Sequence, residues 1–526
     1  MDACVEEVFD VAVVGYGPTG LVAASLLGQA GHRVAVCERW PSLYGLPRLT
    51  HIDDETARAV QSAGDVDEAL RDSSKTEYRW VNGHDEELLR IPGIANGPMG
   101  FPTHISMYQP DVEAAIDRRI REMPNVTLRQ GFLVTDLRQN AADVELTLVA
   151  SETALTARQE RLRARYVIAA DGSKSDLRTA LGAERDDYGF NERWLNFDTE
   201  WLRPAPAEYR TSKQYCDPAR GHMYMNIGEH RQRFEFALLD GESKEDFGRV
   251  EMAWELLKRF HDLGPDDVRI IRQIVYTFEA RVARQWRHDR VFLAGDAAHT
   301  MPPYLGQGAC SGVRDASNLA WKLDLVLRGL ADQSLLDSYQ DERKPHVTTV
   351  THMAIGLGTI ANTHDPVAAA ERDAMLKSGH APPPPEMPPI SRGVIARQAD
   401  GTAASAAGTL VPQGCVTVGE RTGRFDDIVG RGFVLVTTID AGADLRPEQR
   451  DFLDELGCRI VRLGHDVIDD DGVHTAYLEK LGAVGYLARP DFVLFGSASG
   501  GSQIETLVDE LRSALAWSVA ATEASV

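Results

Sequence analysis

The segment Gly15-Tyr16-Gly17-Pro18-Thr19-Gly20 is the feature that most limits how this chain can fold. It follows a short, continuously apolar run from Phe9 to Val14 and precedes a helical pattern from about Thr19 to Ala30. A second apolar run then leads to Glu38. Strand, glycines, helix, strand and acid in this order predict a β-α-β unit of a doubly wound, mostly parallel sheet.

The three glycines of this unit each suit a separate physical task. Gly15 permits a tight turn, Gly17 lets the backbone approach a pyrophosphate, and Gly20 lets the helix pack close to the strand. The N-terminus of the helix offers free N–H groups and a positive dipole end to the phosphates, and Glu38 can accept hydrogen bonds from ribose hydroxyls. The unit therefore predicts dinucleotide binding, but alone it does not separate FAD from NAD.

Two later apolar strands also end at acid and glycine. Tyr166–Ala170 ends at Asp171-Gly172, and Val291–Ala294 ends at Gly295-Asp296. The second of these segments continues to Gly306-Gln307-Gly308, where a long helical pattern begins. The chain thus has three strand ends with the chemistry of a nucleotide site.

The remaining pattern indicates how the chain is divided. Residues 186–280 alternate apolar and polar, which predicts an antiparallel β-sheet domain inserted into the nucleotide fold. Residues 1–185, with some segments near 75–105 assigned to the inserted sheet, and residues 281–365 are expected to form the nucleotide-binding part. An Ala- and Pro-rich linker over 366–400, which can form neither helix nor strand, then leads to a small α/β domain over 401–526.

Composition excludes several classes of partner. The 526 residues contain 56 Lys plus Arg against 79 Asp plus Glu, for a net charge of −23, so nucleic acid and anionic membranes are not expected to bind. The six cysteines are scattered without a C-x-x-C pair or metal-ligand spacing, no signal peptide is evident, and no apolar run has the length of a membrane span. These features predict a cytoplasmic, reduced protein without a metal site.

The three strand-end segments, in this order, resemble the signatures of the class A flavoprotein aromatic hydroxylases. Further segments are similar to the 3-(3-hydroxyphenyl)propionate hydroxylase and phenol hydroxylase type: Pro47-Arg48, Ile52–Glu55, Gln109-Pro110, Cys216–Pro218, Arg233–Phe236 and Asn318–Lys322. The resemblance covers about residues 8 to 350 and, more loosely, the C-terminal domain. It implies a Rossmann-like FAD-binding domain with an inserted antiparallel β-sheet substrate domain, plus a C-terminal thioredoxin-like α/β domain. Because that domain lacks C-x-x-C, we expect it to be structural or to support a homodimer.

The resemblance also implies a reaction. NADH or NADPH would reduce FAD, and O2 would give a flavin C4a-hydroperoxide that hydroxylates a phenolic aromatic substrate. Two alternatives remain at this point. The chain could be a tailoring oxygenase of a polycyclic aromatic polyketide, or a non-catalytic scaffold protein that carries FAD. Flavin-dependent halogenases are disfavoured because no W-x-W-x-I-P segment is present.

By position in the family, a set of residues from these segments is expected to bind the cofactor. They are Gly15, Gly17, Pro18, Thr19, Gly20, Glu38, Arg39, Arg48, Gln109, Asp171, Gly172, Gly295, Asp296, Pro303, Gly306, Gln307, Gly308, Ala309 and Cys310. Asp296 would bind the ribitol, and the helix that starts at Gly306 would direct N–H groups to the flavin pyrimidine edge. Cys310 stands where the family usually has Asn, so the contact there is expected to differ.

A hydroxylase of this kind must deprotonate or hydrogen-bond the phenol of its substrate. The candidates are His51, Tyr215 and Asp53, and His51 would serve as a proton acceptor near neutral pH. Arg220, Arg231 or Arg233 could hold a substrate carboxylate. An apolar wall is expected from Met223, Met225, Phe234, Phe236 and Tyr304.

Overall fold

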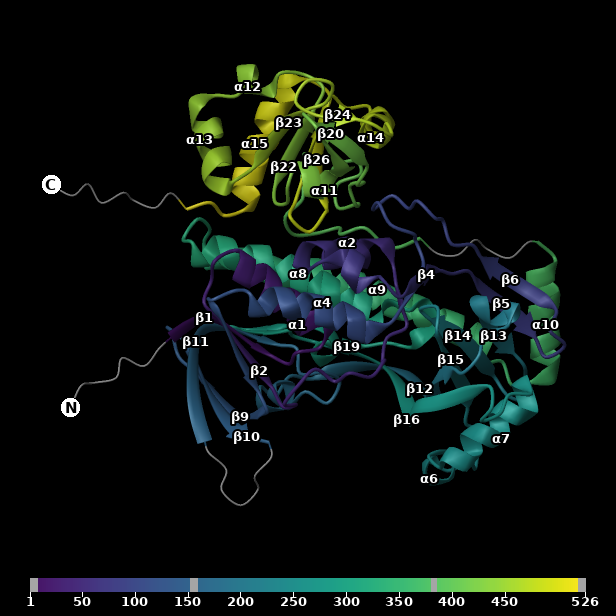
Figure 1. Ribbon diagram of the computed structural model, residues 1–526. Coiled ribbons are helices and arrows are strands. Elements are labelled where there is room, and N and C mark those ends of the chain that lie inside the picture. Colours follow the sequence, from purple (N-terminus) through teal and green to yellow (C-terminus); the bar gives the residue numbers. More distant parts are fainter. Residues whose placement is uncertain (1–7, 152–158, 380–385, 519–526) are drawn as a thin grey trace.

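The computed structural model describes residues 8–151, 159–379 and 386–518. Residues 380–385, which hold most of the proline run of the predicted linker, lie outside this range. The described chain is a mixed α/β fold in which two large sheets lie side by side and a separate C-terminal domain packs against one flank (Figure 1).

The first large sheet forms the nucleotide-binding part. Its strand order is β17-β18-β11-β1-β2-β8, and β9 and β10 extend it beside β11. The pairs of β1 with β2 and β11, of β2 with β8, and of β11 with β18 are all parallel. The strands are β1 (Val8–Val14), β2 (Val34–Glu38), β8 (Val126–Gln130), β9 (Phe132–Gln139), β10 (Val144–Ala150), β11 (Gln159–Ala169), β17 (Arg287–His288) and β18 (Val291–Leu293).

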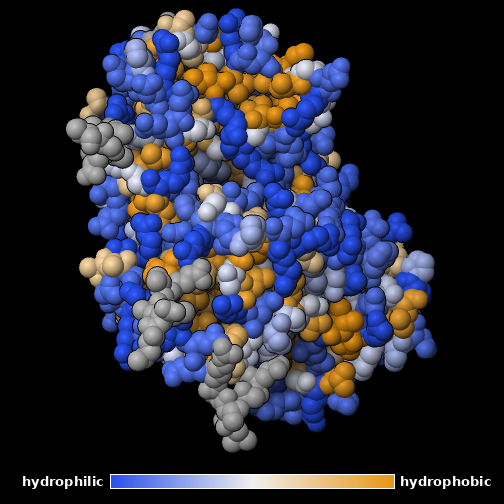
Figure 2. Space-filling model, turned by 60° about the vertical axis from the view of Figure 1, so that its left-hand side comes forward, coloured by the Kyte–Doolittle hydropathy of each residue, from blue (hydrophilic) through white to orange (hydrophobic). Residues whose placement is uncertain are grey.

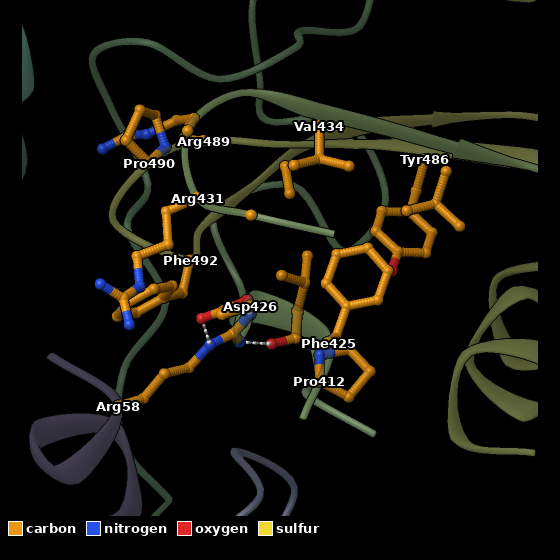
Figure 3. A pocket seen from close by; sticks show the side chains of 15 residues that line it. Arg58, Pro412, Phe425, Asp426, Arg431, Val434, Tyr486, Arg489, Pro490 and Phe492 are labelled. Carbon is orange, nitrogen blue, oxygen red and sulfur yellow. Dashed lines mark hydrogen bonds and ion pairs between the residues drawn. The ribbon is translucent and has the colours of Figure 1, made fainter. Parts of the chain in front are cut away.

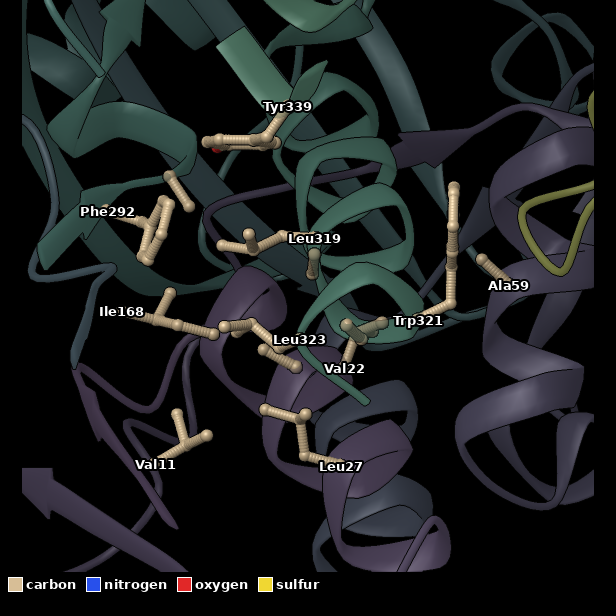
Figure 4. Packing of buried hydrophobic residues seen from close by; sticks show 14 of the residues in the cluster. Val11, Val22, Leu27, Ala59, Ile168, Phe292, Leu319, Trp321, Leu323 and Tyr339 are labelled. Carbon is tan, nitrogen blue, oxygen red and sulfur yellow. The ribbon is translucent and has the colours of Figure 1, made fainter. Parts of the chain in front are cut away.

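Helices α1 (Pro18–Gln29) and α8 (Gln307–Leu327) cover one face of this sheet. Val11, Ile168 and Phe292 reach from three strands toward Val22 and Leu323 on these helices (Figure 4). Each fully buried side chain of this kind contributes about 1.5–3 kcal/mol through removal of apolar surface from water. The core therefore fixes both glycine-rich helix starts against the same sheet.

The second large sheet has the order β19-β16-β12-β15-β14-β13-β5-β6. Long antiparallel strands β12 (Arg185–Trp201) and β16 (Val268–Ala283) lie at its centre, and the other members are β5 (Tyr78–Asn82), β6 (Glu87–Ile91), β13 (Ser212–Cys216), β14 (His222–Ile227), β15 (Arg231–Ala237) and β19 (His299–Thr300). Helices α6 (Lys244–Phe247) and α7 (Val250–His261) cover its outer face, where Phe197, Phe234 and Leu257 are buried together. Its other face is turned toward the nucleotide-binding part (Figure 1).

Shorter elements connect these two parts. A small sheet of β3 (His51–Ile52), β4 (Ser73–Lys75) and β7 (Ile105–Met107) lies between them. The helices of this region are α2 (Asp54–Ala63), α3 (Val66–Ala69), α4 (Gln109–Arg121), α5 (Asp176–Ala180), α9 (Asp337–Ala361) and α10 (Pro366–Lys377).

The C-terminal domain is thioredoxin-like. Its sheet has the order β23-β22-β25-β26, in which β22 pairs parallel with β23 and antiparallel with β25. Its strands are β22 (Val434–Thr437), β23 (Arg459–Arg462), β25 (Gly485–Ala488) and β26 (Leu494–Ala498), and a smaller sheet contains β20 (Cys415–Val418), β21 (Arg421–Arg424) and β24 (Ile468–Asp469). Its helices are α11 (Phe425–Ile428), α12 (Ala441–Asp444), α13 (Pro447–Leu456), α14 (Val473–Leu481) and α15 (Gly501–Ala514).

This domain lies over α2 and α8 (Figure 1) and is held there by buried ion pairs. Arg58 of α2 donates to both carboxylate oxygens of Asp426 at 2.8 Å (Figure 3). Arg489 donates to both oxygens of Glu342 on α9, at 3.1 and 2.7 Å. The domain therefore docks onto the helices that carry the nucleotide-site residues.

The predicted linker is wrong in part. Residues Pro366–Lys377 form α10, with Asp365 capping the helix by accepting from Ala368 N–H at 2.8 Å. Proline at the first helical position is compatible with a helix, since no intrahelical N–H is needed there. Beyond the gap, Ile390, Val394 and Ile395 are buried, so this segment packs on the protein rather than extending into solvent.

Hydrophilic side chains cover most of the face in Figure 2, in keeping with the acidic composition. Among the described residues, no helix has the length and apolarity that crossing a membrane requires.

Candidate active site

The strand ends identified in the sequence meet at one edge of the first sheet. Val14 of β1 pairs with Ala169 of β11 and Cys37 of β2, and Ala169 pairs with Leu293 of β18. Since all four strands are parallel, the turns that follow them lie side by side. This edge is where ligands bind in doubly wound sheets.

The glycine unit has the geometry of a nucleotide cradle. Gly15 adopts φ +102°, and a Cβ there would lie 2.2 Å from the carbonyl oxygen of Ala170. A Cβ on Gly20 would lie 2.0 Å from the oxygen of Gly15, so the helix packs directly on the turn. At Gly17, the N-cap of α1, no atom lies within 4 Å of such a Cβ. The bare backbone at the helix N-terminus fits a bound pyrophosphate.

Four residues next to this cradle have defined positions and contacts that the sequence alone did not indicate. Glu38 accepts hydrogen bonds from the N–H groups of Tyr16 (2.8 Å) and Trp40 (3.0 Å), so it fixes the turn it faces. Arg39 donates to the carbonyl of Asp171 at 3.2 Å. Pro18 opens α1. Thr19 lies under Gly295 and Gly312, where its hydroxyl occupies the space that a Cβ would need, so it packs two turns together.

Asp171 caps a helix rather than facing open space. Its carboxylate accepts from the Ser175 hydroxyl (2.5 Å) and from Leu177 N–H (3.2 Å). Gly172 has φ +89°, and no atom lies within 4 Å of the place that a Cβ would occupy there, so its backbone is accessible. Arg178 donates to the carbonyls of Ser173 and Ala297 at 2.9 and 3.0 Å and thereby ties this turn to the Gly295-Asp296 turn.

The Gly295-Asp296 turn is held from behind by Asp315 of α8. One oxygen of Asp315 accepts from Gly295 N–H (3.0 Å) and His299 Nε2 (2.7 Å), and the other accepts from Arg343 (2.9 Å). Burial alone would raise the pKa of this carboxyl, but His299 and Arg343 lower it to about 2. An ionised, fully buried Asp315 therefore fixes the turn.

Asp296 itself is free to bind a ligand. Its side chain is exposed, and no hydrogen bond joins it to any other described residue. Dense surroundings raise the pKa of its carboxyl, and the charges of His299 and Arg48 oppose that shift. An unpartnered carboxylate beside the glycine cradle fits the hydroxyl groups of the ribitol chain of FAD.

The start of α8 is built around Gly306. This residue has φ +65°, and a Cβ there would lie 2.8 Å from Nδ1 of His51. The nearest atom to a Cβ on Gly308 is 4.0 Å away, so the first turn of α8 presents uncovered backbone, with the half-buried Ala309 beside it. Pro303 is exposed in the short helix that precedes this turn. Uncovered N–H groups here suit a ring with a negatively charged edge.

Two predicted cofactor residues on α8 point elsewhere. Gln307 is buried, with its amide donating to Asp53 (3.1 Å) and its oxygen accepting from Arg314 (2.7 Å). The thiol of Cys310 is buried and donates to the carbonyl of Gly306 at 3.4 Å. Burial, with Asp53 nearby, raises the pKa of this thiol to about 12, so it is a neutral packing group.

Arg48 and Gln109 contact each other. The Arg48 guanidinium stacks on Tyr44, with its central carbon 3.8 Å from the ring centroid. Gln109 is buried, and its side-chain oxygen accepts from the N–H groups of Arg48 (2.8 Å) and Leu49 (2.7 Å). Gln109 therefore positions the loop that carries Arg48.

The expectation that His51 titrates near neutral pH is wrong. Its Nε2 lies 3.0 Å from Nδ1 of His104, and its Nδ1 faces Gly306. Burial, and then the neighbouring His104, lower its pKa to about 4. His51 is therefore a neutral imidazole whose Nε2 is engaged by His104, and its low pKa makes it a weak proton acceptor at neutral pH.

Asp53 is also placed as a structural group. It caps α2 by accepting from Thr56 N–H (2.8 Å), and it pairs with Arg314 at 2.5 Å. Although burial acts in the opposite direction, Arg314 and these hydrogen bonds hold its pKa well below the usual range. Such an acid is a poor proton acceptor, because its conjugate acid is too strong.

The second sheet separates the predicted substrate residues onto two faces. Met223 and Met225 alternate with His222 and Tyr224 on β14, and Met225 lies 2.6 Å from the Thr50 hydroxyl, toward the nucleotide part. We call this inner face the sheet floor. Tyr215 stacks on His222 at 4.2 Å between ring centroids, which places it on the outer face.

The prediction that Phe234 and Phe236 form an apolar wall for the substrate is also corrected. Both pack with Phe197 in the core beneath α7 and not on the sheet floor. A strand alternates its side chains with period two, so their neighbours Arg233 and Glu235 take the floor instead. Burial raises the pKa of Tyr215, so its phenol is neutral on the outer face.

The three arginines proposed to hold a carboxylate are all paired. Arg220 donates to both oxygens of Glu242, at 2.9 and 2.5 Å. Arg231 pairs with Asp72 (2.6 Å). Arg233 donates to both oxygens of Asp198 (2.6 and 3.1 Å) and to the carbonyls of Pro47 and Arg48, so it anchors the loop of Arg48.

Tyr304 lies in an apolar cluster, and its contact with a substrate stays a prediction. It is buried with Trp80 and Phe190, and its hydroxyl donates to Glu192 at 2.8 Å. Gly358 lies directly against its ring.

The sequence interpretation missed the polar residues of the sheet floor. Glu235 is buried opposite Met223, and its Oε1 accepts from the Asn196 amide at 2.8 Å. Gln214, also buried, accepts from the Tyr78 hydroxyl at 3.2 Å. Burial raises the pKa of Glu235 to about 7, against the opposing charge of Arg233. The alternation of polar and apolar residues along β15 is visible in the sequence. Only the pairing of β15 with β14 shows that Arg233 and Glu235 face inward, and not Phe234 and Phe236.

Comparison with known proteins agrees with this geometry. A family model described as an FAD binding domain matches residues 8–354, and a second, described as the HcaD C-terminal domain, matches residues 408–514. The chain belongs to the FAD-binding aromatic hydroxylase family. It is an FAD-dependent monooxygenase of phenolic aromatic compounds that uses NADH or NADPH as co-substrate.

Individual relatives extend over most of the chain. A probable NADH-specific resorcinol 4-hydroxylase of Rhodococcus jostii (strain RHA1) is 38% identical over 520 residues, covering 96% of this chain and 95% of the relative. A 3-(3-hydroxy-phenyl)propionate/3-hydroxycinnamic acid hydroxylase of Comamonas testosteroni is 34% identical, covering 71% of this chain and 62% of the relative. The solved structure of aklavinone-11 hydroxylase with FAD and aklavinone has the same fold, with a TM-score of 0.79 at 24% identity, covering 96% of this chain and 99% of that one.

Proposed function

We propose that this hydroxylase acts on a small, uncharged phenol of the resorcinol type and takes its electrons from NADH. The resemblance to the Rhodococcus jostii enzyme, which extends over nearly the whole of both chains, supports this substrate class and this nucleotide. The Comamonas testosteroni relative, whose name gives a carboxylate-bearing substrate, matches a smaller share of this chain.

One structural observation carries the preference for an uncharged substrate. By strand alternation Arg231, Arg233 and Arg272 share this face, and they pair with Asp72 (Arg231) and with the buried Asp198 (Arg233 and Arg272). Glu235 adds a further acid to this floor. A substrate carboxylate on this floor would therefore meet arginines that are already paired with acids, and burying it without a partner is costly.

FAD, when bound, supplies the activation of O2 and the transfer of oxygen to the ring. The residues of the chain have three other tasks. Asp296 and the glycine cradle hold the cofactor, the sheet floor holds and orients the phenol, and Tyr304 with Trp80 keeps one wall free of water.

The partner and location predictions belong to the same proposal. O2 is the second small-molecule partner, and the protein is placed in the cytoplasm, where reduced cysteines persist. The five cysteines of the described chain are all free thiols, which supports this location. The homodimer stays a prediction, which light scattering of the holoenzyme tests.

A substrate screen tests the proposed function. Purified holoenzyme is mixed with resorcinol, phenol, 3-(3-hydroxyphenyl)propionate or a polycyclic phenol, each with NADH and with NADPH, and oxidation of the nucleotide is compared with product mass. We expect coupled oxidation with resorcinol and NADH. Coupled turnover of the propionate in preference to resorcinol would overturn the uncharged-substrate proposal and leave the family assignment intact.

A further inference from the structure

Glu235 is a buried carboxyl group that the fold does not fully satisfy. It is 4% exposed and lies on β15 of the sheet floor, directly opposite Met223 of β14 and Asn196 of β12. Its Oε1 accepts from Asn196 Nδ2 at 2.8 Å. Among the described residues no hydrogen bond reaches its Oε2, and the carbonyl oxygen of the Asn196 side chain is buried without a partner. A buried acceptor without a partner, such as this amide oxygen, calls for an explanation.

Glu235 lies on the face of the sheet that is turned toward the nucleotide-binding part. Its strand neighbour Arg233 donates to the carbonyls of Pro47 and Arg48, which belong to the loop beside Asp296. Trp194, two residues before Asn196 on β12, has its ring centroid 6.5 Å from that of Tyr304, just before the Gly306 turn. Glu235 thus lies on the same face of the sheet as the residues that contact the loop of Arg48 and the segment before Gly306.

The charged and titratable groups around Glu235 set its behaviour. Arg233 of its own strand and Arg272 of β16 favour the ionised form, whereas Asp198 of β12 opposes it. Tyr78 of β5 is neutral, because burial raises its pKa well above the usual value. Burial outweighs the two arginines and raises the pKa of Glu235 to about 7. A group of this pKa can take a proton near neutral pH and release it again.

The other acid–base candidates are excluded by their surroundings. Burial, and then His104 at 3.0 Å from Nε2, lower the pKa of His51 to about 4. Asp53 is held in an ion pair with Arg314, and Tyr215 lies on the outer face of the sheet. Glu235 is a buried acid of the sheet floor whose Oε2 has no hydrogen bond to any described residue.

We propose that Glu235, oriented by Asn196, accepts the proton of the substrate's phenolic hydroxyl. The O–H bond of the phenol breaks as a new O–H bond forms at Oε2 of Glu235, and the electron pair stays on the phenolate oxygen. This charge makes the ring positions ortho and para to that oxygen more nucleophilic. No electrons leave the substrate in this step, and the proton returns to solvent when product departs. Asn196 is a positioning residue, since it acts through the carboxylate.

This inference rests on the proposed function only in that the substrate is a phenol. Glu235→Gln keeps the shape and the acceptor for Asn196 but cannot take a proton. We expect it to lower the rate of hydroxylation by about 10²- to 10⁴-fold, while FAD content and phenol binding stay near those of the wild type. Nucleotide oxidation should continue with loss of coupling, so that hydrogen peroxide replaces hydroxylated product.

Two further readouts separate proton transfer from a structural effect. In the wild type the rate should rise with pH through about 7 and then level off. In Glu235→Gln this rise of the rate with pH should vanish. The difference in rate from the wild type should shrink as pH approaches the pKa of a phenol, about 10, because the substrate then ionises unaided. A resorcinol analogue made more acidic by fluorine should shrink the ratio of wild-type to variant rate at fixed pH.

Matched variants keep the test decisive. Asp54→Asn removes another acid whose pKa burial raises, but its oxygens accept from the backbone of Glu55 and Met99, away from the sheet floor, so the pH profile should be unchanged. Glu235→Asp, which retains an acid, should restore part of the rate and the rise of the rate near pH 7. If Glu235→Gln folds, binds FAD and hydroxylates within about threefold of the wild type with the same pH profile, the assignment of Glu235 is overturned. If no phenol supports turnover in the wild type, the proposed function fails instead.

Discussion

Arg489 of the C-terminal domain donates hydrogen bonds to both oxygens of Glu342 on α9, at 3.1 and 2.7 Å. Lys322 of α8 lies 2.9 Å from the same carboxylate, and all three side chains are fully buried. Asp491 pairs with Arg489 as well, at 2.6 Å, so Glu342 is the acid that links the cation of the docked domain to the cation of the helix whose first turn faces the cofactor. The C-terminal domain is thus joined to the catalytic part through charge as well as apolar packing.

Glu342→Gln should destabilise the protein strongly, because it leaves Arg489 and Lys322 without their shared counter-charge. Breaking a buried pair by removing one partner costs about 3–5 kcal/mol. Chemical denaturation of the apoprotein measures the loss. The neighbouring Asp341 is exposed, so Asp341→Asn is the control and should change the free energy of unfolding by less than about 0.5 kcal/mol. Equal stability of the two variants would show that the docking charge network contributes little.

Asp296→Ala should weaken FAD binding while leaving the fold intact. Asp296 is an exposed carboxylate without a hydrogen bond to any other described residue, so its removal leaves no protein group unpaired. Hydrogen bonds to a charged group are worth about 1.5–3 kcal/mol, which corresponds to roughly a ten- to hundredfold rise in the dissociation constant. Titration of apoprotein with FAD gives this constant. The exposed Asp136 of β9 provides the control variant Asp136→Ala, and a loss of affinity as large in the control would remove the special role of Asp296.

Gly306→Ala should destabilise the apoprotein, whereas Gly308→Ala should not. Gly306 has φ +65°, and its added methyl group would lie 2.8 Å from Nδ1 of His51, while Gly308 has open space. The strained conformation alone costs about 1–2 kcal/mol. Removing the imidazole in the double variant His51→Ala/Gly306→Ala should recover part of the loss, so the two single effects should not add. Strict additivity in denaturation measurements would contradict the contact between these residues.

Glu235→Gln should make the protein more stable at alkaline pH. The folded pKa of about 7 lies above the ordinary value of 4.5, so the native state binds the proton more tightly than the unfolded state does. Stability from this group is present below pH 4.5 and is lost as pH rises to about 7. The variant should therefore melt a few degrees above the wild type at pH 8 and close to it at pH 5. A gap of the same size at both pH values would mean that Glu235 is not the titrating group.

The residues of the nucleotide-binding edge could be predicted from the sequence, whereas most residues of the sheet floor could not. Gly15, Gly17 and Gly20 could be interpreted from local order alone, because a short β-α-β unit fixes their surroundings. The floor depends on pairing between strands that lie far apart along the chain. Phe234 and Phe236 were assigned to the substrate because they are apolar, yet α7 offers them a second core on the outer face. Their neighbour Glu235 then takes the inner face by alternation.

His51 and Asp53 illustrate the second limit of prediction from sequence. Their residue types suit acid–base chemistry, but their partners come from remote segments: His104 for His51, and Arg314 for Asp53. These contacts engage Nε2 of the imidazole and stabilise the ionised carboxylate. Neither partner has a spacing in the chain that indicates the contact.

Oxygen labelling tests the central claim most directly. The purified holoenzyme is supplied with NADH, resorcinol and 18O2 in ordinary water, and the product is analysed by mass spectrometry. We expect a trihydroxybenzene that carries one labelled oxygen, formed in step with nucleotide oxidation. Product whose new oxygen comes from water, or nucleotide oxidation that no phenol stimulates, would contradict a flavin-dependent hydroxylation.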